Sequence, residues 1–318
     1  MSVSTYANTV MPLNKKSLPA RLIKNVRTHP YLYIMAIPVM AYYILFHYGP
    51  MYGAQIAFKE YSPGLGIWGS PWVGLKHFRS FINDIYFTRI VTNTIMISVF
   101  QLVFAFPVPI ILALLINELT NRIFKKTVQT VIYMPHFISL IVICGLVLDF
   151  TSRSGVLNDI IAFFGGERIN MMREASLFRP VYIISGIWQE SGWGTIIYLA
   201  ALAGVDVELY EAARIDGANK FQQIRHVTFP GILPTIVIML ILRVGSMMNV
   251  GYEKIILLYN STIYSTADVI SSYTYRKGLL DFNFSYSSMV GLFNSIINFS
   301  LVVMANAFSR RVNETSLW

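Results

Sequence analysis

The chain has 318 residues, of which 55% are hydrophobic and only 13% are charged, and its mean hydropathy is +0.54. Soluble domains carry about 25% charged residues, so this composition excludes an ordinary soluble protein and requires that lipid faces part of the surface. The formal net charge of +9 fits the inner leaflet or an acidic ligand. The single cysteine, Cys144, excludes a disulfide framework or a thiolate metal site within the chain and is expected to serve in packing.

A basic amphipathic segment comes first. In Leu18–His29, apolar residues at helical spacing alternate with Arg21, Lys24 and Arg27, which is typical of a helix that lies in the membrane interface. The alternative is a disordered basic tail. We expect residues 1–30 to form this N-terminal segment, residues 31–308 a membrane-spanning domain and residues 309–318 a C-terminal tail.

Six apolar segments are long enough to span a bilayer, which needs about 20 mostly apolar residues. We expect these spans at Tyr31–Phe58, Thr88–Ile116, Thr127–Phe150, Phe178–Ala203, Gly231–Gly251 and Tyr286–Phe308. The first is too long for the core of a signal peptide and has no small-x-small cleavage site after it, so we interpret it as an uncleaved anchor. With both termini in the cytoplasm, 13 Lys and Arg lie inside and 10 outside, a weak bias in favour of that orientation.

A polar insert separates the fourth and fifth spans. Asp206 predicts the N-cap of a short helix, and Asp216-Gly217 predicts its end, with Gly217 in the left-handed conformation. A second short helix is expected over Asn219–Thr228, ended by Pro230. Both helices fall below the ~12–15 residues at which helices are marginal in water, so they need a surface to pack on. The net charge of the insert, −1, argues against a DNA-binding helix-turn-helix.

The insert, at residues 204–230, resembles the EAA loop of ABC importer permeases. The likeness rests on Glu211-Ala212-Ala213, Asp216-Gly217-Ala218 and Pro230, while the family's Ile-x-Leu-Pro ending reads Val227-Thr228-Phe229-Pro230 here. In that family the loop forms a short cytoplasmic coupling helix in a cleft of the ATPase subunit. The resemblance implies that coupling involves Glu211, Ala212, Ala213, Arg214, Asp216, Gly217, Ala218 and Phe221. The alternative is a connecting hairpin that packs on its own protein.

The likeness extends over nearly the whole chain. YLYIMAIPVMAYYILFHYGPMYGAQIAFKEYSP and SPWVGLKHFRSF resemble the carbohydrate-uptake permeases, in particular the branch for oligosaccharides and polysaccharide fragments that includes the alginate importer. It implies an all-α membrane protein with the six-helix, type I ABC importer permease fold and a multi-pass position in the bacterial inner membrane, with both termini cytoplasmic.

The resemblance also implies partners. They are a second homologous permease subunit, more readily a heterodimer than a homodimer, two ABC ATPase subunits, an extracytoplasmic sugar-binding protein and the lipid bilayer. No nucleic acid is expected. The sequence has no GxxxxGK phosphate-binding loop, so no cofactor is expected in this chain, and the partner ATPase would bind ATP and magnesium.

Polar residues inside the spans are candidates for a substrate pathway. Arg243 and Glu190 lie mid-span, where they would either form an ion pair that sets helix register or line a sugar pathway. Trp188, Gln189 and Trp193 surround Glu190. Aromatic rings stack on sugar faces and amides bind hydroxyls, but tryptophan also gathers at the membrane interface.

Further candidates lie at the end of the fifth span and within the sixth: Asn249, Tyr252, Glu253, Asn294 and Asn298. Asn294 and Asn298 share a helix face at i, i+4 spacing, and they would bond either a neighbouring helix or the substrate. Arg243 and the positive net charge permit an acidic, uronate-type oligosaccharide. Lipid headgroups would suit the inner charges equally well.

Two other classes of protein fit less well. A membrane glycosyl or lipid transferase would need clustered carboxylates, histidines or a metal site, whereas the five histidines are scattered without an HExxH motif. A stand-alone secondary carrier usually contains internal repeats, which the sequence does not display, and it would leave the polar insert unexplained. The sequence therefore favours a permease subunit that works by alternating access.

Overall fold

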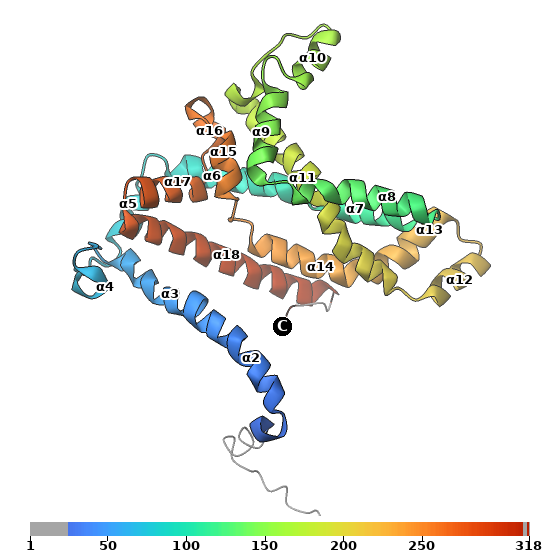
Figure 1. The fold of residues 1–318 in the computed structure, drawn as a ribbon, viewed down its shortest axis with the longest axis horizontal. Coiled ribbons are helices and arrows are strands. Elements are labelled where there is room, and N and C mark those ends of the chain that lie inside the picture. Colours follow the sequence, from blue (N-terminus) through green and yellow to red (C-terminus); the bar gives the residue numbers. More distant parts are fainter. Residues whose placement is uncertain (1–24, 314–316, 318) are drawn as a thin grey trace, which may run out of the picture. The chain divides into compact units, whose positions relative to one another are not determined.

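The computed structural model describes residues 25–313 and 317, and the chain divides into two compact units, Met1–Gln55 and Ile56–Trp318 (Figure 1). The described residues are helical, with one isolated antiparallel bridge between Lys59 and Trp72. The all-α fold class is thus confirmed for the described part of the chain.

The first unit consists mainly of one helical run. It contains α2 (Pro30–Tyr43), a π-helical turn η1 (Ile44–Tyr48), α3 (Gly49–Met51) and the start of η2 (Tyr52–Phe58). Pro30 occupies the first turn, where a missing N–H is not needed. The predicted interfacial helix lies mostly outside the described residues, although residues 25–28 are helical.

The second unit holds the remaining helices. Its first half contains α4 (Gly66–Gly69), α5 (Lys76–Ile82), α6 (Phe87–Phe100), η3 (Gln101–Ala105), α7 (Pro107–Asn117), α8 (Arg122–Tyr133), η4 (Met134–Phe137), α9 (Leu140–Thr151), α10 (Val156–Phe163) and η5 (Met171–Arg173). Its second half contains α11 (Ala175–Ala203), α12 (Val207–Ile215), α13 (Lys220–Gln223), η6 (Ile224–Thr228), α14 (Phe229–Gly245), α15 (Tyr252–Leu258), η7 (Ser261–Ile263), α16 (Tyr264–Ala267), α17 (Ile270–Tyr275), η8 (Arg276–Leu280) and α18 (Phe284–Asn313).

Five stretches of the described residues are long and apolar enough to cross a membrane, not six. They are Pro30–Phe58, Phe87–Asn117, Leu140–Phe163, Lys220–Gly245 and Phe284–Arg311. The fourth predicted span does form one helix, α11, of 29 residues. At 1.5 Å per residue it is about 44 Å long, but the polar stretch SGIWQESGWG at its centre keeps it out of the apolar set.

Three predicted spans have the wrong boundaries. Thr127–Phe150 is not one helix, because α8 ends at Tyr133, the short 3-10 turn η4 with Pro135 near its start follows, and Ile138 is extended before α9 begins. A proline removes a helical hydrogen bond and clashes with the preceding turn, which explains the break. The fifth span ends at Gly245 instead of Gly251, and α18 continues to Asn313, through the start of the predicted tail.

The prediction that Pro230 ends the second helix of the insert is also wrong, because one helical run continues from Lys220 to Gly245. The π-helical turn η6 explains how. The Phe229 N–H bonds to the Ile224 carbonyl, five residues back. This wider turn accommodates the ring of Pro230, which has no N–H to donate.

Helix α11 is the centre of the second unit and packs against α7, α8 and α14. Glycines allow the close approach: a Cβ at Gly192 would lie 1.8 Å from the carbonyl oxygen of Ile132 in α8, and one at Gly194 would lie 3.1 Å from the ring of Pro109 in α7. Likewise α14 packs along α18, where a Cβ at Gly245 would meet Val302. These contacts fix the face of α11 that carries the candidate site.

A buried ionic cluster ties α6 to the segment between α14 and α18. The fully buried Asp268 pairs with Arg89 at 3.0 Å and Arg276 at 2.7 Å, and Ser272 donates to it at 2.9 Å. No span was predicted here, and none forms: the segment folds as the short helices α15 to η8.

Candidate functional site

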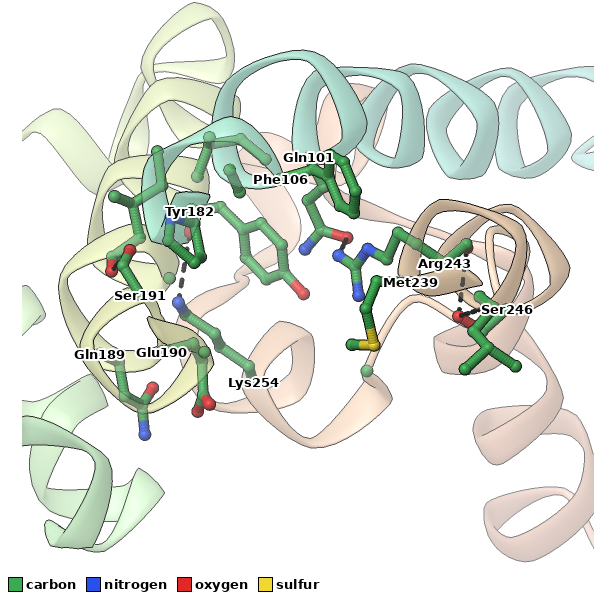
Figure 2. A pocket seen from close by; sticks show the side chains of 18 of the residues that line it. Gln101, Phe106, Tyr182, Gln189, Glu190, Ser191, Met239, Arg243, Ser246 and Lys254 are labelled. Carbon is green, nitrogen blue, oxygen red and sulfur yellow. Dashed lines mark hydrogen bonds between the residues drawn. The ribbon is translucent and has the colours of Figure 1, made fainter. Parts of the chain in front are cut away.

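A cavity of about 700 Å³ lies among α11, α14, α15 and the junction of η3 and α7 (Figure 2). Apolar side chains such as Phe106, Ile183 and Met239 form much of its wall. Ligand cavities of this size are usually apolar with a few polar groups that fix orientation. The polar groups here include Gln101, Gln189 and Ser191.

Three charged side chains line the cavity: Glu190, Arg243 and Lys254. Two cations and one carboxylate give it a formal net charge of +1. In the view of Figure 2, the ring of Tyr182 lies between Lys254 and Arg243. The fold brings Glu190 of α11 together with Arg243 and Lys254, which lie about 50 to 60 residues later in the consecutive helices α14 and α15.

Arg243 lies in the last turn of α14, where a cation interacts favourably with the helix dipole. Its Nη2 donates to Oε1 of Gln101 at 2.9 Å. The side chain is exposed in the cavity, and Gln101, which holds it, was not among the predicted residues.

Lys254 was also missed by the sequence prediction, although its neighbours Tyr252 and Glu253 were included. It lies in the first turn of α15 and is only 8% exposed. Its Nζ donates to the Tyr182 carbonyl at 3.2 Å and lies 4.9 Å from the centre of the Tyr182 ring. The available signal was a lysine directly ahead of the apolar run Ile255–Leu258.

Glu190 and Arg243 share the cavity but have different partners. The Glu190 carboxylate pairs with Nδ1 of His136 at 3.0 Å, and the His136 ring stacks on Trp193, 4.6 Å between centres. The ion pair considered for Glu190 and Arg243 is therefore not formed. His136 was not predicted, because it lies in η4, distant in sequence from α11.

The other predicted pathway residues divide into two groups. Gln189 lines the cavity, whereas Trp188 and Trp193 are half-exposed and do not. Glu253 is exposed in the first turn of α15 and does not line it either.

The asparagines link helices. The Asn249 side-chain oxygen accepts from Asn294 at 2.8 Å and from Asn298 at 3.0 Å, and Asn298 in turn accepts from the Met248 N–H at 3.0 Å. Tyr252 and Asn294 line a smaller hollow of about 310 Å³, in which Tyr252 stacks on Tyr275. These residues are thus not at the charged cavity.

The start and the end predicted for the first helix of the insert are confirmed. Asp206 caps α12 by accepting from the Glu208 N–H at 3.0 Å, and Gly217 is left-handed with φ +77°. The Ala218 N–H bonds to the Ala213 carbonyl at 2.9 Å and the Gly217 N–H to the Arg214 carbonyl at 3.0 Å. This pair of bonds is a Schellman motif, which satisfies the last carbonyls of α12.

Side-chain contacts join the two helices of the insert to each other and to the end of α7. The Tyr210 hydroxyl donates to Thr228 at 3.1 Å, and Lys220 pairs with Glu118 at 2.8 Å. Helix α12 projects beyond the ends of α11 and α14 (Figure 1). Apolar side chains remain uncovered on this insert, since Ile215 is 86% and Phe221 71% exposed.

The chain matches a known family over most of the second unit. Residues 105–314 match the family described as "Binding-protein-dependent transport system inner membrane component". The matched range contains every charged residue of the cavity and the whole insert.

Two curated proteins and one solved structure are similar over almost the entire chain. The polygalacturonan/rhamnogalacturonan transport system permease protein YteP of Bacillus subtilis (strain 168) is 44% identical and covers 96% of this chain and 95% of its own length. Protein LplB of the same organism is 44% identical over 91% of each chain. A bacterial ABC transporter involved in the import of the acidic polysaccharide alginate is similar with a TM-score of 0.85 and 41% identity, over 92% of this chain and 99% of its own.

Proposed function

Because the chain belongs to the family of binding-protein-dependent transport system inner membrane components, we propose that it is a permease subunit of an ATP-driven importer of oligosaccharides. The cavity among α11, α14 and α15 carries this proposal. It is large enough for a sugar unit, mostly apolar and lined by polar groups from several spans. Polar groups in membrane-spanning segments usually mark a substrate path.

The substrate is an acidic, uronate-type oligosaccharide. The cavity has a formal net charge of +1 from Arg243, Lys254 and Glu190, and charge-assisted hydrogen bonds to carboxylates are stronger than neutral ones. The similar proteins named for polygalacturonan and for alginate handle acidic polymers, which supports the same class here.

The chain adopts the type I permease fold, and its structural likeness to the alginate transporter supports this assignment. The EAA insert docks in a partner ATPase through Glu211–Gly217, Ala218 and Phe221, and a second permease subunit carries the matching insert. ATP-driven closure of the ATPases pulls the two inserts together and turns the cavity outward, and a sugar-binding protein delivers the substrate. Exposed Ile215 and Phe221 supply the apolar contact of this docking.

This function places the chain in the inner membrane with both termini and the insert in the cytoplasm. The catalytic alternatives, a glycosyl or lipid transferase, gain no support from the cavity, whose charged groups are one carboxylate and two cations. A stand-alone carrier leaves the uncovered insert without a role.

Two measurements test the proposal together. The first is mass spectrometry of what co-purifies with the tagged chain from native membranes in mild detergent. We expect a Walker-motif ATPase, a second permease and a binding protein. The second is uptake of labelled galacturonate and alginate trisaccharides by cells that lack the gene, which we expect to lose import. A chain that purifies alone, with uptake unchanged in the deletion, would refute the importer.

A further inference from the structure

We propose that Lys254 is the residue that selects an acidic over a neutral sugar in the cavity. This inference rests on the proposed function and assigns the selection to one side chain. The sequence did not point to Lys254, and its position in the cavity, its burial and its hydrogen bonding together support the assignment.

The Lys254 ammonium is held in a fixed place. Its Nζ donates to the Tyr182 carbonyl at 3.2 Å and lies 4.9 Å from the Tyr182 ring centre. On the helix that carries Tyr182, a Cβ at Gly186 would lie 3.4 Å from Nζ, at van der Waals contact, so the ammonium lies directly against this glycine. Both Tyr182 and Gly186 line the cavity with Lys254.

The ammonium also has unused donors. It carries three N–H groups, and the Tyr182 carbonyl is its one hydrogen-bond acceptor among the described residues. Within that part of the chain no carboxylate lies at ion-pair distance from it, since Glu190 pairs with His136. Glu190 in the same cavity attracts the ammonium only from beyond ion-pair distance, and a buried cation without a paired counter-charge is costly unless a partner arrives. A substrate carboxylate in the cavity supplies that partner.

Arg243 is a weaker candidate for this role. Like Lys254 it has donors left beside its bond, here to Gln101, but its side chain is exposed instead of buried. Arg243 therefore attracts anions to the cavity, whereas the desolvated Lys254 distinguishes a carboxylate from an ester or a hydroxyl.

The test compares a charged probe with its neutral methyl ester. Uptake of labelled galacturonate trisaccharide and of its methyl ester is measured at saturating concentration in cells whose native transporter carries Lys254→Met. Each rate is divided by the wild-type rate for the same probe, which cancels the preference of the binding protein, and by the amount of chain in the membrane. We expect about a tenfold or greater loss for the acid, the size of one charge-assisted hydrogen bond, and less than a twofold change for the ester.

Two further variants complete the test. Lys254→Arg should retain most of the uptake of the acid, because it keeps the charge. Lys76→Met removes an exposed lysine that pairs with Glu60, outside the cavity, and should change neither rate. Equal loss of both probes, or no loss, in Lys254→Met would overturn the selection role while leaving the importer intact. Wild-type cells that import neither probe would overturn the acidic substrate class, and this inference with it.

Discussion

Asp268 has the most deeply buried charge among the described residues, with no exposed surface and two arginine partners, Arg89 and Arg276. Breaking a buried ion pair from one side costs about 3–5 kcal/mol, because the remaining charge stays uncompensated. We expect Asp268→Asn to lower the midpoint of thermal unfolding of the detergent-purified protein by about 5 °C or more. The unfolding midpoint can be followed by intrinsic fluorescence.

The matched control is Asp281→Asn. Asp281 pairs with Lys277 at 2.9 Å on the surface, with half of its side chain exposed. Exposed pairs of this kind contribute about 0–1 kcal/mol, so the control should move the midpoint by no more than a degree or two. Equal shifts in the two variants would show that Asp268 is not a structural centre of this segment.

The sequence predicts the structural role of a residue when that role depends only on its neighbours in the chain. The cap at Asp206 and the left-handed Gly217 depend only on their neighbours in the chain, and both predictions are confirmed. Lys254, His136 and Gln101 were missed because their roles depend on which helices meet at the cavity. Of the two alternatives for Arg243 and Glu190, the ion pair depended on a tertiary contact, and the structure gives each residue another partner while both line the cavity.

At the scale of elements, the contact of α11 with α8 depends on Gly192. An added Cβ there would lie 1.8 Å from the backbone oxygen of Ile132, which cannot move without displacing α8. Overpacking costs about 1–3 kcal/mol or more. We expect Gly192→Ala to reduce both the amount of folded protein in the membrane and its unfolding midpoint, measured by fluorescence size-exclusion chromatography after heating.

Gly145→Ala in α9 is the control for this contact. No atom lies within 4 Å of a Cβ at that position, and alanine is favoured over glycine in a helix interior by about 0.5–1 kcal/mol. The control should leave the midpoint unchanged or raise it. A Gly192→Ala protein as stable as the Gly145→Ala protein would contradict the close packing of α11 on α8.

Gly217 sets the geometry of the EAA insert. Its φ is +77° and its N–H bonds to the Arg214 carbonyl. Proline is fixed near −65° and has no N–H, so it removes the Schellman motif at the end of α12. We expect Gly217→Pro to abolish uptake of the sugar while the chain remains in the membrane in normal amounts, as measured by transport assays beside immunoblots.

Gly66→Pro imposes the same local change elsewhere. Gly66 has φ +66°, its N–H bonds to the Ser62 carbonyl and its Cβ position is open, as at Gly217. It lies outside the insert, so we expect uptake within about twofold of wild type, the effect of roughly 0.4 kcal/mol. If both proline variants transport normally, the insert has no coupling role.

The sequence predicts the presence of a helix more easily than its ends. The length of the apolar stretches was enough to predict α6, α14 and α18. The break after Pro135 and the continuity through Pro230 were both predicted wrongly, although each involves a proline. At Pro230 the widened turn η6 lets the helix continue, and hydropathy does not contain that information.

For the whole molecule, one helix decides the number of spans. Helix α11 has the length of a span but not the hydropathy of one, because it contributes Gln189, Glu190 and Ser191 to the cavity wall. A helix that lines a polar cavity on one side and packs against α7 and α14 on the other needs little contact with lipid. The proposed function requires that α11 crosses the membrane, since it links the insert to the segment after α10.

Phe163 at the end of α10 precedes α11 in the chain, and Ile215 at the end of α12 follows it. Their side chains are 85% and 86% exposed. The chain's only cysteine, Cys144, is 1% exposed, so a single thiol introduced at Phe163→Cys or Ile215→Cys reports its own side of the membrane. We expect a membrane-impermeant maleimide to label Phe163→Cys in right-side-out vesicles and Ile215→Cys only in inverted ones, with the parent chain unlabelled in both. Labelling of both positions from the same side would mean that α11 does not cross the membrane, and the EAA insert would then lie on the same side as α10. The reverse pattern would keep α11 as a span but put the insert outside, where no ATPase could reach it.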